Sequence, residues 1–259
     1  MQGRRILLEV CVEGADGLAA AVAGGADRVE LCAALVVGGL TPSPGLMALA
    51  ASASCPVFAM IRPRPGDFVY SPAEEAVMRG DIAAVAQAGL AGIVLGACRT
   101  DGRLDEAMLG RLLDHARACG VRHATLHRAF DEAADAGVAL EVAIGLGFAR
   151  ILTSGGGATA WDGRERLRAL VARAGGRIAV MAGGGVSPES AAALVAATGV
   201  EEVHGSCRGR DMPRGQGVRN AGFGDNPVPT DRATVGAVRR ALDDAGAAAT
   251  MSGDCSRRE

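Results

Sequence analysis

The chain contains no lysine, so all 27 of its Lys and Arg positions are arginines. Schiff-base catalysis requires a lysine amine, so lysine-dependent aldolases and pyridoxal-phosphate enzymes are excluded. The arginines are not gathered into a basic block, and the formal net charge is only -2. We therefore expect neither a nucleic-acid partner nor a membrane-surface partner.

The chain also lacks a signal-peptide core and any apolar run of ~18 residues that could span a membrane. These absences predict a cytoplasmic protein. The cysteines are odd in number, form no CxxC pair and show no zinc-finger spacing. In a chain of this size, that pattern favours reduced thiols over a disulfide framework. The seven cysteines are Cys11, Cys32, Cys55, Cys98, Cys119, Cys207 and Cys255.

Length and hydropathy predict one domain around one large core. The 259 residues are 49% hydrophobic, and a single barrel of strands and helices commonly has this size. Strand-like apolar runs alternate with segments of helical period, such as the one carrying Leu109, Leu112 and Leu113. The eight predicted strands are 6–12, 28–33, 57–62, 92–97, 123–129, 150–154, 177–182 and 203–207.

Strands such as 92–97 and 177–182 carry apolar runs that are continuous rather than alternating, which is typical of parallel strands covered on both faces. Eight such strand and helix units predict an α/β fold, a single-domain (β/α)8 TIM barrel over about 5–247 of the 1–259 domain. An open doubly wound sheet is the alternative. The segment 208–229, rich in glycine, arginine and proline, predicts a long loop before the last helix, and residues from about 248 to 259 are expected to fray.

Two helix starts are predicted from capping residues. Ser71 supplies a hydroxyl acceptor, Pro72 fits the first helical position, and Glu74 is placed to complete a capping box. Ser187 and Pro188 repeat the first two parts of this pattern, so we expect a second helix to begin there.

Two Glu-x-Cys steps stand near the ends of the first two predicted strands. They are Glu9 with Cys11, and Glu30 with Cys32. Residues two apart on a strand share a face, and neighbouring strands lie about 5 Å apart. We therefore expect each carboxylate to point with its thiol, and the two thiols to be able to meet.

Polar residues follow most of the other strands, at the end of the barrel where catalytic groups gather. Glu9, Glu30, His127, Asp131 and His204 are candidates for general acid/base catalysis. Anion binding is predicted for Arg62, Arg64 and Arg128, with Asp67 and Thr153 nearby. An equally weighted interpretation makes the three arginines structural ion-pair partners of Glu9 and Glu30. The glycine-rich turn at Gly183 and Gly184 is a weaker candidate for cradling an anion.

Several stretches together resemble the CutC family, which is named for copper homeostasis. They are Leu8-Glu9-Val10-Cys11-Val12, Gly25-Ala26-Asp27-Arg28-Val29-Glu30-Leu31-Cys32, Gly38-Gly39-Leu40-Thr41-Pro42-Ser43, Ile61-Arg62-Pro63-Arg64-Pro65-Gly66-Asp67-Phe68, His127-Arg128-Ala129-Phe130-Asp131, Leu152-Thr153-Ser154-Gly155 and Glu202-Val203-His204. The resemblance covers roughly residues 5–245 and departs from the family pattern mainly after Ser206. It implies a cytoplasmic barrel that forms homo-oligomers, as a dimer or tetramer, and binds monovalent copper, Cu(I), through Cys11 and Cys32.

Three functions are consistent with these residues. The first is a copper homeostasis protein whose Cys11 and Cys32 supply the thiolates that a soft monovalent ion prefers. The second is an enzyme acting on a small anionic metabolite, a carboxylate or a phosphate, by acid/base or metal chemistry. The third is a scaffold in which the polar residues only satisfy one another.

Overall fold

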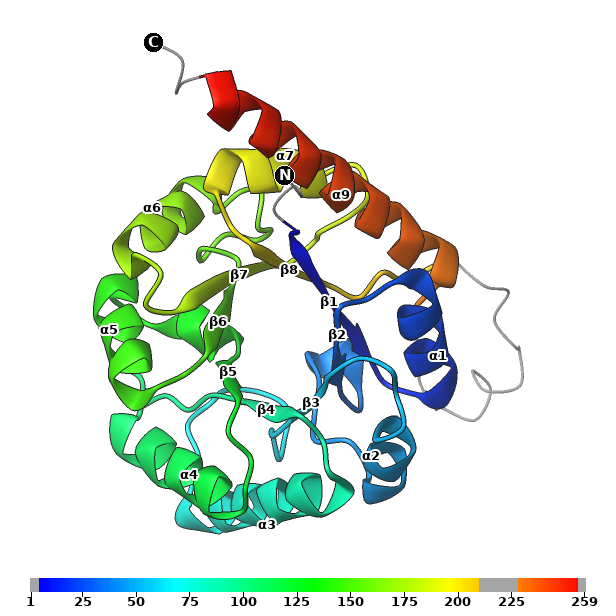
Figure 1. Ribbon diagram of the computed structural model, residues 1–259. Helices are drawn as coiled ribbons and strands as arrows, with labels where there is room; N and C mark the ends of the chain where they lie inside the picture. The colour runs from blue at the N-terminus through cyan, green and yellow to red at the C-terminus, as the bar shows by residue number, and fades with distance from the viewer. Residues whose placement is uncertain (1–4, 210–227, 256–259) are drawn as a thin grey trace, which may run out of the picture.

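A computed structural model describes residues 5–209 and 228–255, with side chains up to 247. Its eight parallel strands form a closed barrel in the order β1 to β8, with β8 beside β1 (Figure 1). This closure confirms the predicted TIM barrel and excludes the open doubly wound sheet. The strands are β1 Leu7–Val12, β2 Arg28–Leu31, β3 Val57–Met60, β4 Gly92–Leu95, β5 Ala124–Leu126, β6 Arg150–Thr153, β7 Ala179–Gly183 and β8 Glu202–Gly205.

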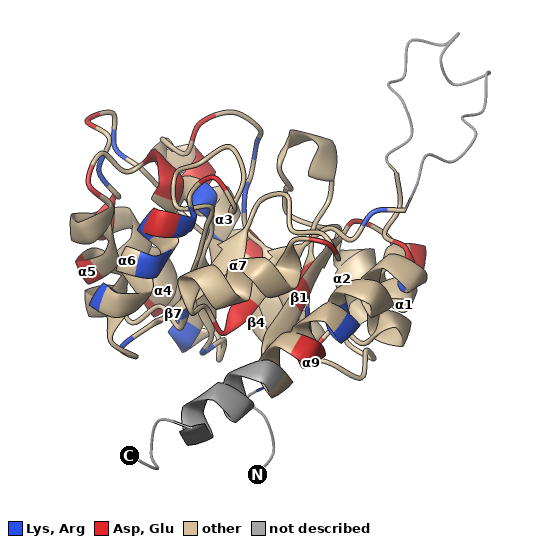
Figure 2. Cartoon of the chain, turned by 90° about the horizontal axis from the view of Figure 1, so that it is seen from above, with Lys and Arg blue, Asp and Glu red and all other residues tan. Residues whose placement is uncertain are grey.

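Helices surround the barrel and bury its outer face (Figures 1 and 2). The main apolar core contains side chains of both strands and helices, including Leu8 of β1 and Leu112 of α4. Within the described residues, no helix is long and apolar enough to cross a membrane. The helices are α1 Ala15–Gly24, η1 Leu35–Val37, α2 Pro44–Ala50, α3 Pro72–Ala88, α4 Glu106–Ala118, η2 Arg128–Glu132, α5 Ala136–Leu146, α6 Arg164–Ala174, α7 Ala191–Thr198 and α9 Arg232–Cys255.

One of the two predicted helix starts is confirmed and the other is wrong. Ser71 and Glu74 form the complete capping box of α3. The helix expected at Ser187 begins instead at Ala191, and Ser190 Oγ accepts a hydrogen bond from the Ser187 N–H. Because the two hydroxyls bond each other across a turn, this Ser-Pro step forms a loop rather than a cap.

The strand register is staggered, and the stagger decides which residues meet. Cys11 lies opposite Glu30, while Glu9 lies opposite Arg28 on β2 and opposite His204 on β8. The two Glu-x-Cys steps are therefore offset by two residues rather than aligned side by side. This offset is the stagger that closing a sheet into a barrel requires.

The two described ends of the segment predicted as a long loop, residues 208–209 and 228–230, lie together beside the end of β8. Arg208 forms an isolated bridge with Thr230, and the Asp231 N–H donates to the Cys207 carbonyl. Thr230 Oγ1 also lies 3.4 Å from the carbonyl oxygen of Cys11, so Thr230 packs behind the first strand. The predictions for 210–227 and for the end of the chain at 256–259 lie outside the described residues, and α9 runs through the expected start of the frayed tail.

Candidate functional site

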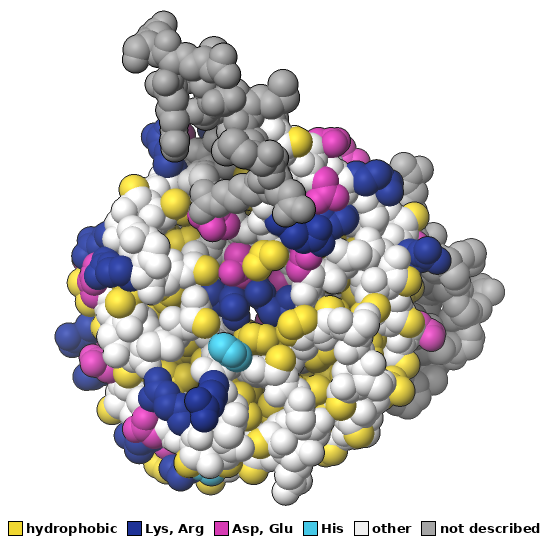
Figure 3. Space-filling model, viewed as in Figure 1, with side chains coloured by type: hydrophobic (Ala, Val, Ile, Leu, Met, Phe, Trp, Pro, Cys, Tyr) yellow, Lys and Arg dark blue, Asp and Glu magenta, His cyan; other side chains and the backbone are white. Residues whose placement is uncertain are grey.

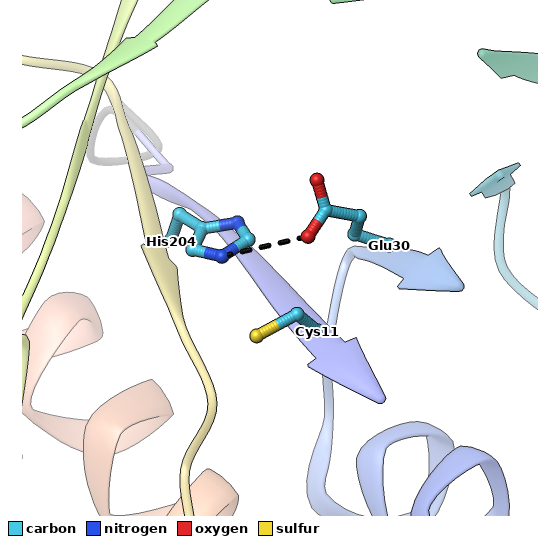
Figure 4. Close-up of side chains that lie close together, drawn as sticks. All are labelled: Cys11, Glu30 and His204. Atoms are coloured by element: carbon cyan, nitrogen blue, oxygen red, sulfur yellow. Dashed lines mark ion pairs between the residues drawn. The ribbon is translucent and has the colours of Figure 1, made fainter. Parts of the chain in front are cut away.

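Three side chains of metal-ligand type meet inside the barrel, on the adjacent strands β8, β1 and β2 (Figure 4). One ligand atom from each of Cys11, Glu30 and His204 lies within 4.8 Å of the other two. Cys11 and Glu30 meet because they are cross-strand partners. Thiol, carboxylate and imidazole are all transition-metal ligands in proteins. This cluster, hereafter the Cys-Glu-His cluster, can therefore hold a metal ion.

Glu9 holds His204 in one orientation. Its Oε1 lies 2.9 Å from His204 Nδ1, and its Oε2 accepts a hydrogen bond from Arg28 Nε. Because Nδ1 bonds to this carboxylate, Nε2 is the nitrogen directed at Glu30, with 3.8 Å to Oε2. A carboxylate that bonds one ring nitrogen of a histidine fixes the orientation of the ring and leaves the other nitrogen free to bind a metal ion.

Cys32 lies beside the Cys-Glu-His cluster without being one of its members. Its Sγ is 3.5 Å from Glu30 Oε2, the same oxygen that faces His204. The side chains packed around it are Phe58, Met60 and Val94. The structure thus groups Cys11 with Glu30 and His204, and joint ligation by Cys11 and Cys32 stays a prediction.

Burial and neighbouring charges have opposing effects on the pKa values of the cluster residues His204 and Glu30. Burial by itself lowers the pKa of His204, but the negative charges of Cys11 and Glu30 and the hydrogen bonds to the ring raise that pKa well above 6.5. Burial raises the pKa of Glu30, with the His204 charge opposing it, and also raises the pKa of the Cys32 thiol well above 9.0. A metal ion at this site must therefore displace protons.

A cavity of about 470 Å³ opens onto the Cys-Glu-His cluster. It lies where the strands end, because the turns after β7 and β8 contribute Val186 and Ser206 to its wall. Most of the predicted site residues share this space, as the barrel geometry implied. Those that line it are Cys11, Glu30, Arg62, His127, Arg128, Asp131, Gly184 and His204.

Arg64 and Asp67 are predicted site residues that the structure places outside this cavity lining. Arg64 Nη2 lies 2.8 Å from Asp67 Oδ1, and Arg64 Nε pairs with Glu74 of the α3 capping box. Its guanidinium also lies over the Tyr70 ring, 5.2 Å from the centroid. These contacts join a loop to the start of α3, and a role in anion binding stays a prediction for both residues.

Asp131 ties the short helix η2 to the end of β6. Its carboxylate accepts hydrogen bonds from Thr153 Oγ1 and from the N–H groups of Ser154 and Gly156. It also pairs with Arg128 at 2.8 Å, and Arg128 in turn bonds Ser154 Oγ. Since these contacts occupy both oxygens, Asp131 fixes the loop, while its predicted acid/base role remains a prediction.

Gly183 at the end of β7 and Gly184 directly after it stand where a side chain is disfavoured by close packing or by backbone conformation. A Cβ on Gly183 would lie 2.5 Å from Leu152 Cδ1, so the absence of a side chain lets β7 pack against β6. Gly184 has φ +110 and lines the cavity. This left-handed conformation favours glycine, and the anion cradle predicted for this turn remains a prediction.

The interpretation of the three arginines as partners of the two glutamates is wrong for the described residues. Arg62, Arg64 and Arg128 form no ion pair with Glu9 or Glu30 there. Arg64 pairs with Asp67 of its own loop and with Glu74 of α3, and Arg128 pairs with Asp131 of the same short helix η2. The two buried glutamates therefore take their positive partners from elsewhere.

Sequence reasoning missed Arg28, the partner of Glu9. Arg28 also pairs with Glu202, which accepts from Arg150 Nε at 3.1 Å. The signal was available, because Arg28 stands two residues before Glu30 and so shares its strand face.

Figure 3 views the end of the barrel where the strands begin, and basic and acidic side chains gather at its centre.

Phe68 is a second missed residue, and it lines the cavity. The Arg62 guanidinium carbon lies 5.1 Å from its ring centroid. The His127 ring lies 4.8 Å from the same ring, tilted by 45°. One aromatic ring thus brings a predicted arginine and a predicted histidine onto the same wall.

Comparison with known proteins gives consistent matches. The model of the CutC family matches residues 6–209. A family protein CutC from Sinorhizobium medicae is 54% identical over 240 residues, covering 92% of this chain and 97% of its own length. One from Caulobacter vibrioides is 56% identical over 81% of this chain and 84% of its own. The crystal structure of CutC from Streptococcus agalactiae, named for copper homeostasis, has a TM-score of 0.73 and 33% identity, covering 78% of this chain and 98% of its own.

Proposed function

Since this chain belongs to the CutC family, we propose that it binds monovalent copper at the Cys-Glu-His cluster. The observation that carries this proposal is the position of Cys11, Glu30 and His204 within 4.8 Å of one another, open to a cavity. Cu(I) is a soft ion that prefers thiolate and also accepts imidazole. Cys11 and His204 are therefore the principal ligands, and Cys32, beside Glu30, is the candidate for a second sulfur.

A cytoplasmic location and a homo-oligomeric state belong to the same proposal. The described cysteines are all free, which is the form expected in a reducing compartment. Relatives of similar length are described as CutC proteins, and the family resemblance implies a dimer or tetramer. Light scattering on the purified protein measures the oligomeric state directly.

The acid/base enzyme has less support from this geometry. Both oxygens of Glu9 are occupied by Arg28 and His204, and those of Asp131 by loop contacts. A residue whose lone pairs are already engaged is poorly placed to accept a substrate proton. The two carboxylates thus serve better as positioning groups than as proton acceptors.

The test is a competition for Cu(I) between reduced protein and a colorimetric copper chelator under argon. We expect Cys11→Ser to weaken binding by at least about 100-fold, because it removes the ligand a soft ion prefers. Cys32→Ser separates the two sulfur arrangements, since its effect is large only if Cys32 also coordinates. Cys98→Ser is the matched control, because Cys98 is a buried thiol that bonds the Ala129 carbonyl instead.

Zinc is the competing metal, because a Cys, Glu and His set also suits a tetrahedral zinc site. A parallel titration with Zn(II) is therefore needed. Tighter binding of Zn(II) than of Cu(I) would overturn the copper assignment while leaving the cluster as a metal centre. Unchanged Cu(I) affinity in Cys11→Ser would reject the cluster itself.

A further inference from the structure

Arg62 is a buried cation without a carboxylate partner in the described part of the chain. It is only 5% exposed. Its guanidinium is held by three backbone carbonyls, those of Val37 at 2.7 Å, Gly39 at 3.0 Å and Gly66 at 2.8 Å. Its Nε–H has no hydrogen-bond partner among the residues that the structure describes. Buried charges are normally paired, so this arrangement leaves both a charge and a donor unsatisfied.

His127 presents a second unsatisfied donor. It is 3% exposed, and its Nδ1 accepts a hydrogen bond from the Ala129 N–H at 3.1 Å. Burial and the nearby Arg62 charge lower the pKa of His127 to about 3, so the ring is neutral. In a neutral ring with Nδ1 as acceptor, the proton resides on Nε2. That Nε2–H has no partner among the described residues.

The two donors belong to one wall of one cavity. Arg62 and His127 both line it, and both lie close to the ring of Phe68. The cavity volume of about 470 Å³ falls within the range of small-molecule sites. An unsatisfied cation and a neutral N–H donor that line one cavity are the kinds of group that bind an anionic oxygen.

We propose that this wall binds the carboxylate group of a small organic acid, with Arg62 as its charge partner and His127 Nε2–H as a hydrogen-bond donor. Charge matching selects a carboxylate over a phosphate. Of the three described arginines that line the cavity, Arg62 contributes one buried unpaired charge, Arg128 is paired with Asp131, and Arg208 is exposed to solvent. Two separate N–H donors also match the two oxygens of a carboxylate. This proposal is independent of copper.

The test uses metal-free wild-type protein and a panel of named probes at millimolar concentration. Lactate, pyruvate and succinate are compared with lactamide and succinamide, which keep the shape without the charge. Inorganic phosphate and sulfate form a separate arm. Nitrogen-15 NMR then follows the Arg62 Nε–H and His127 Nε2–H signals, and we expect at least one carboxylate, but neither amide, to shift both.

Variants then test the two donors separately. His127→Asn retains an acceptor for the Ala129 N–H and removes the Nε2–H donor, and we expect affinity for the bound acid to fall about ten-fold or more. Arg62→Met keeps the apolar contact with Phe68 and should lower affinity at least as much. Arg103→Met is the matched control, because Arg103 pairs with Asp101 at the surface, outside the cavity lining, and it should leave affinity unchanged.

Three results would overturn the proposal. One is a panel in which no carboxylate shifts either signal in the wild-type protein. Another is full affinity for the acid in a folded His127→Asn protein. The third is tighter binding of phosphate or sulfate than of every carboxylate. Since Cys11 is untouched in these experiments, their outcome is separate from that of the copper titration.

Discussion

Glu9 couples the Cys-Glu-His cluster to the charged interior of the barrel. One oxygen bonds His204 in the cluster, and the other bonds Arg28 toward the opposite end. Burial by itself raises the pKa of Glu9, but these two partners lower it to about 2 from 4.5. A buried carboxylate that bridges two cations is stabilising only while both remain in place.

The lowered pKa makes stability depend on pH in a defined direction. A carboxylate with a depressed pKa stabilises the fold above its unfolded value, here 4.5, and this contribution is lost as pH falls through about 2. His204 acts in the opposite sense, because its pKa is raised. Its contribution is complete below pH 6.5 and is lost as pH rises through the raised value.

We predict that Glu9→Gln lowers the free energy of unfolding at pH 7 by about 3 kcal/mol, because it removes a buried charge from between two cations. Urea unfolding at a series of pH values measures this. The wild-type protein should lose more stability than the variant between pH 4.5 and about 2. Glu141→Gln is the control, since Glu141 pairs with Arg173 and Arg177 at the surface, where solvent screens the pairs and their loss should change stability little. Parallel pH curves for wild type and Glu9→Gln would contradict the prediction.

The strands and their order around the barrel were predictable from sequence, but their register was not. The strand segments are short and mostly apolar, continuously so in β4 and β7, so all eight could be placed without knowing their partners. The register depends on how the strands are staggered when the barrel closes. This stagger places Cys11 opposite Glu30 rather than beside Cys32. Arg28 was missed for a related reason, since it lies at the start of β2 rather than at the end where site residues were sought.

Of the two helix starts predicted from capping residues, only one is present in the structure. Ser71 and Ser187 both precede a proline, yet only Ser71 caps a helix. The difference is a tertiary one, because Ser187 bonds Ser190 across a turn. A Ser-Pro step in the sequence is therefore not sufficient to predict that the serine caps a helix.

Ser71→Ala should lower the free energy of unfolding by about 1 kcal/mol, because it deletes the acceptor of the Glu74 N–H in the α3 capping box. Ser187→Ala changes the same residue type before a proline and should cost less than about 0.5 kcal/mol. Denaturant midpoints with unchanged slopes compare the two variants. Equal losses would mean that the capping box contributes nothing beyond an ordinary surface hydroxyl.

The molecule as a whole has an unusually charged barrel interior and an apolar shell around it. The small apolar cluster of Cys32, Phe58, Met60 and Val94 is separate from the main core that strands and helices share. Much of the hydrophobic stabilisation therefore comes from helices packed on the outside. Closure of that shell depends on contact between the first and last helices, α1 and α9.

Gly24 lies at that closure, so its substitution tests the assembled ring. A Cβ on Gly24 would lie 2.5 Å from the Cβ of Val235 in α9, which is fully buried. We predict that Gly24→Ala lowers the free energy of unfolding by about 1–3 kcal/mol, because one of the two helices must move. Gly80→Ala is the matched control in the exposed face of α3, where nothing lies within 4 Å. It should raise stability by about 0.5–1 kcal/mol through better helix propensity. Urea unfolding, with slopes unchanged from wild type, measures the change in the free energy of unfolding for both variants. A stabilising Gly24→Ala would mean that α9 does not close the shell against α1.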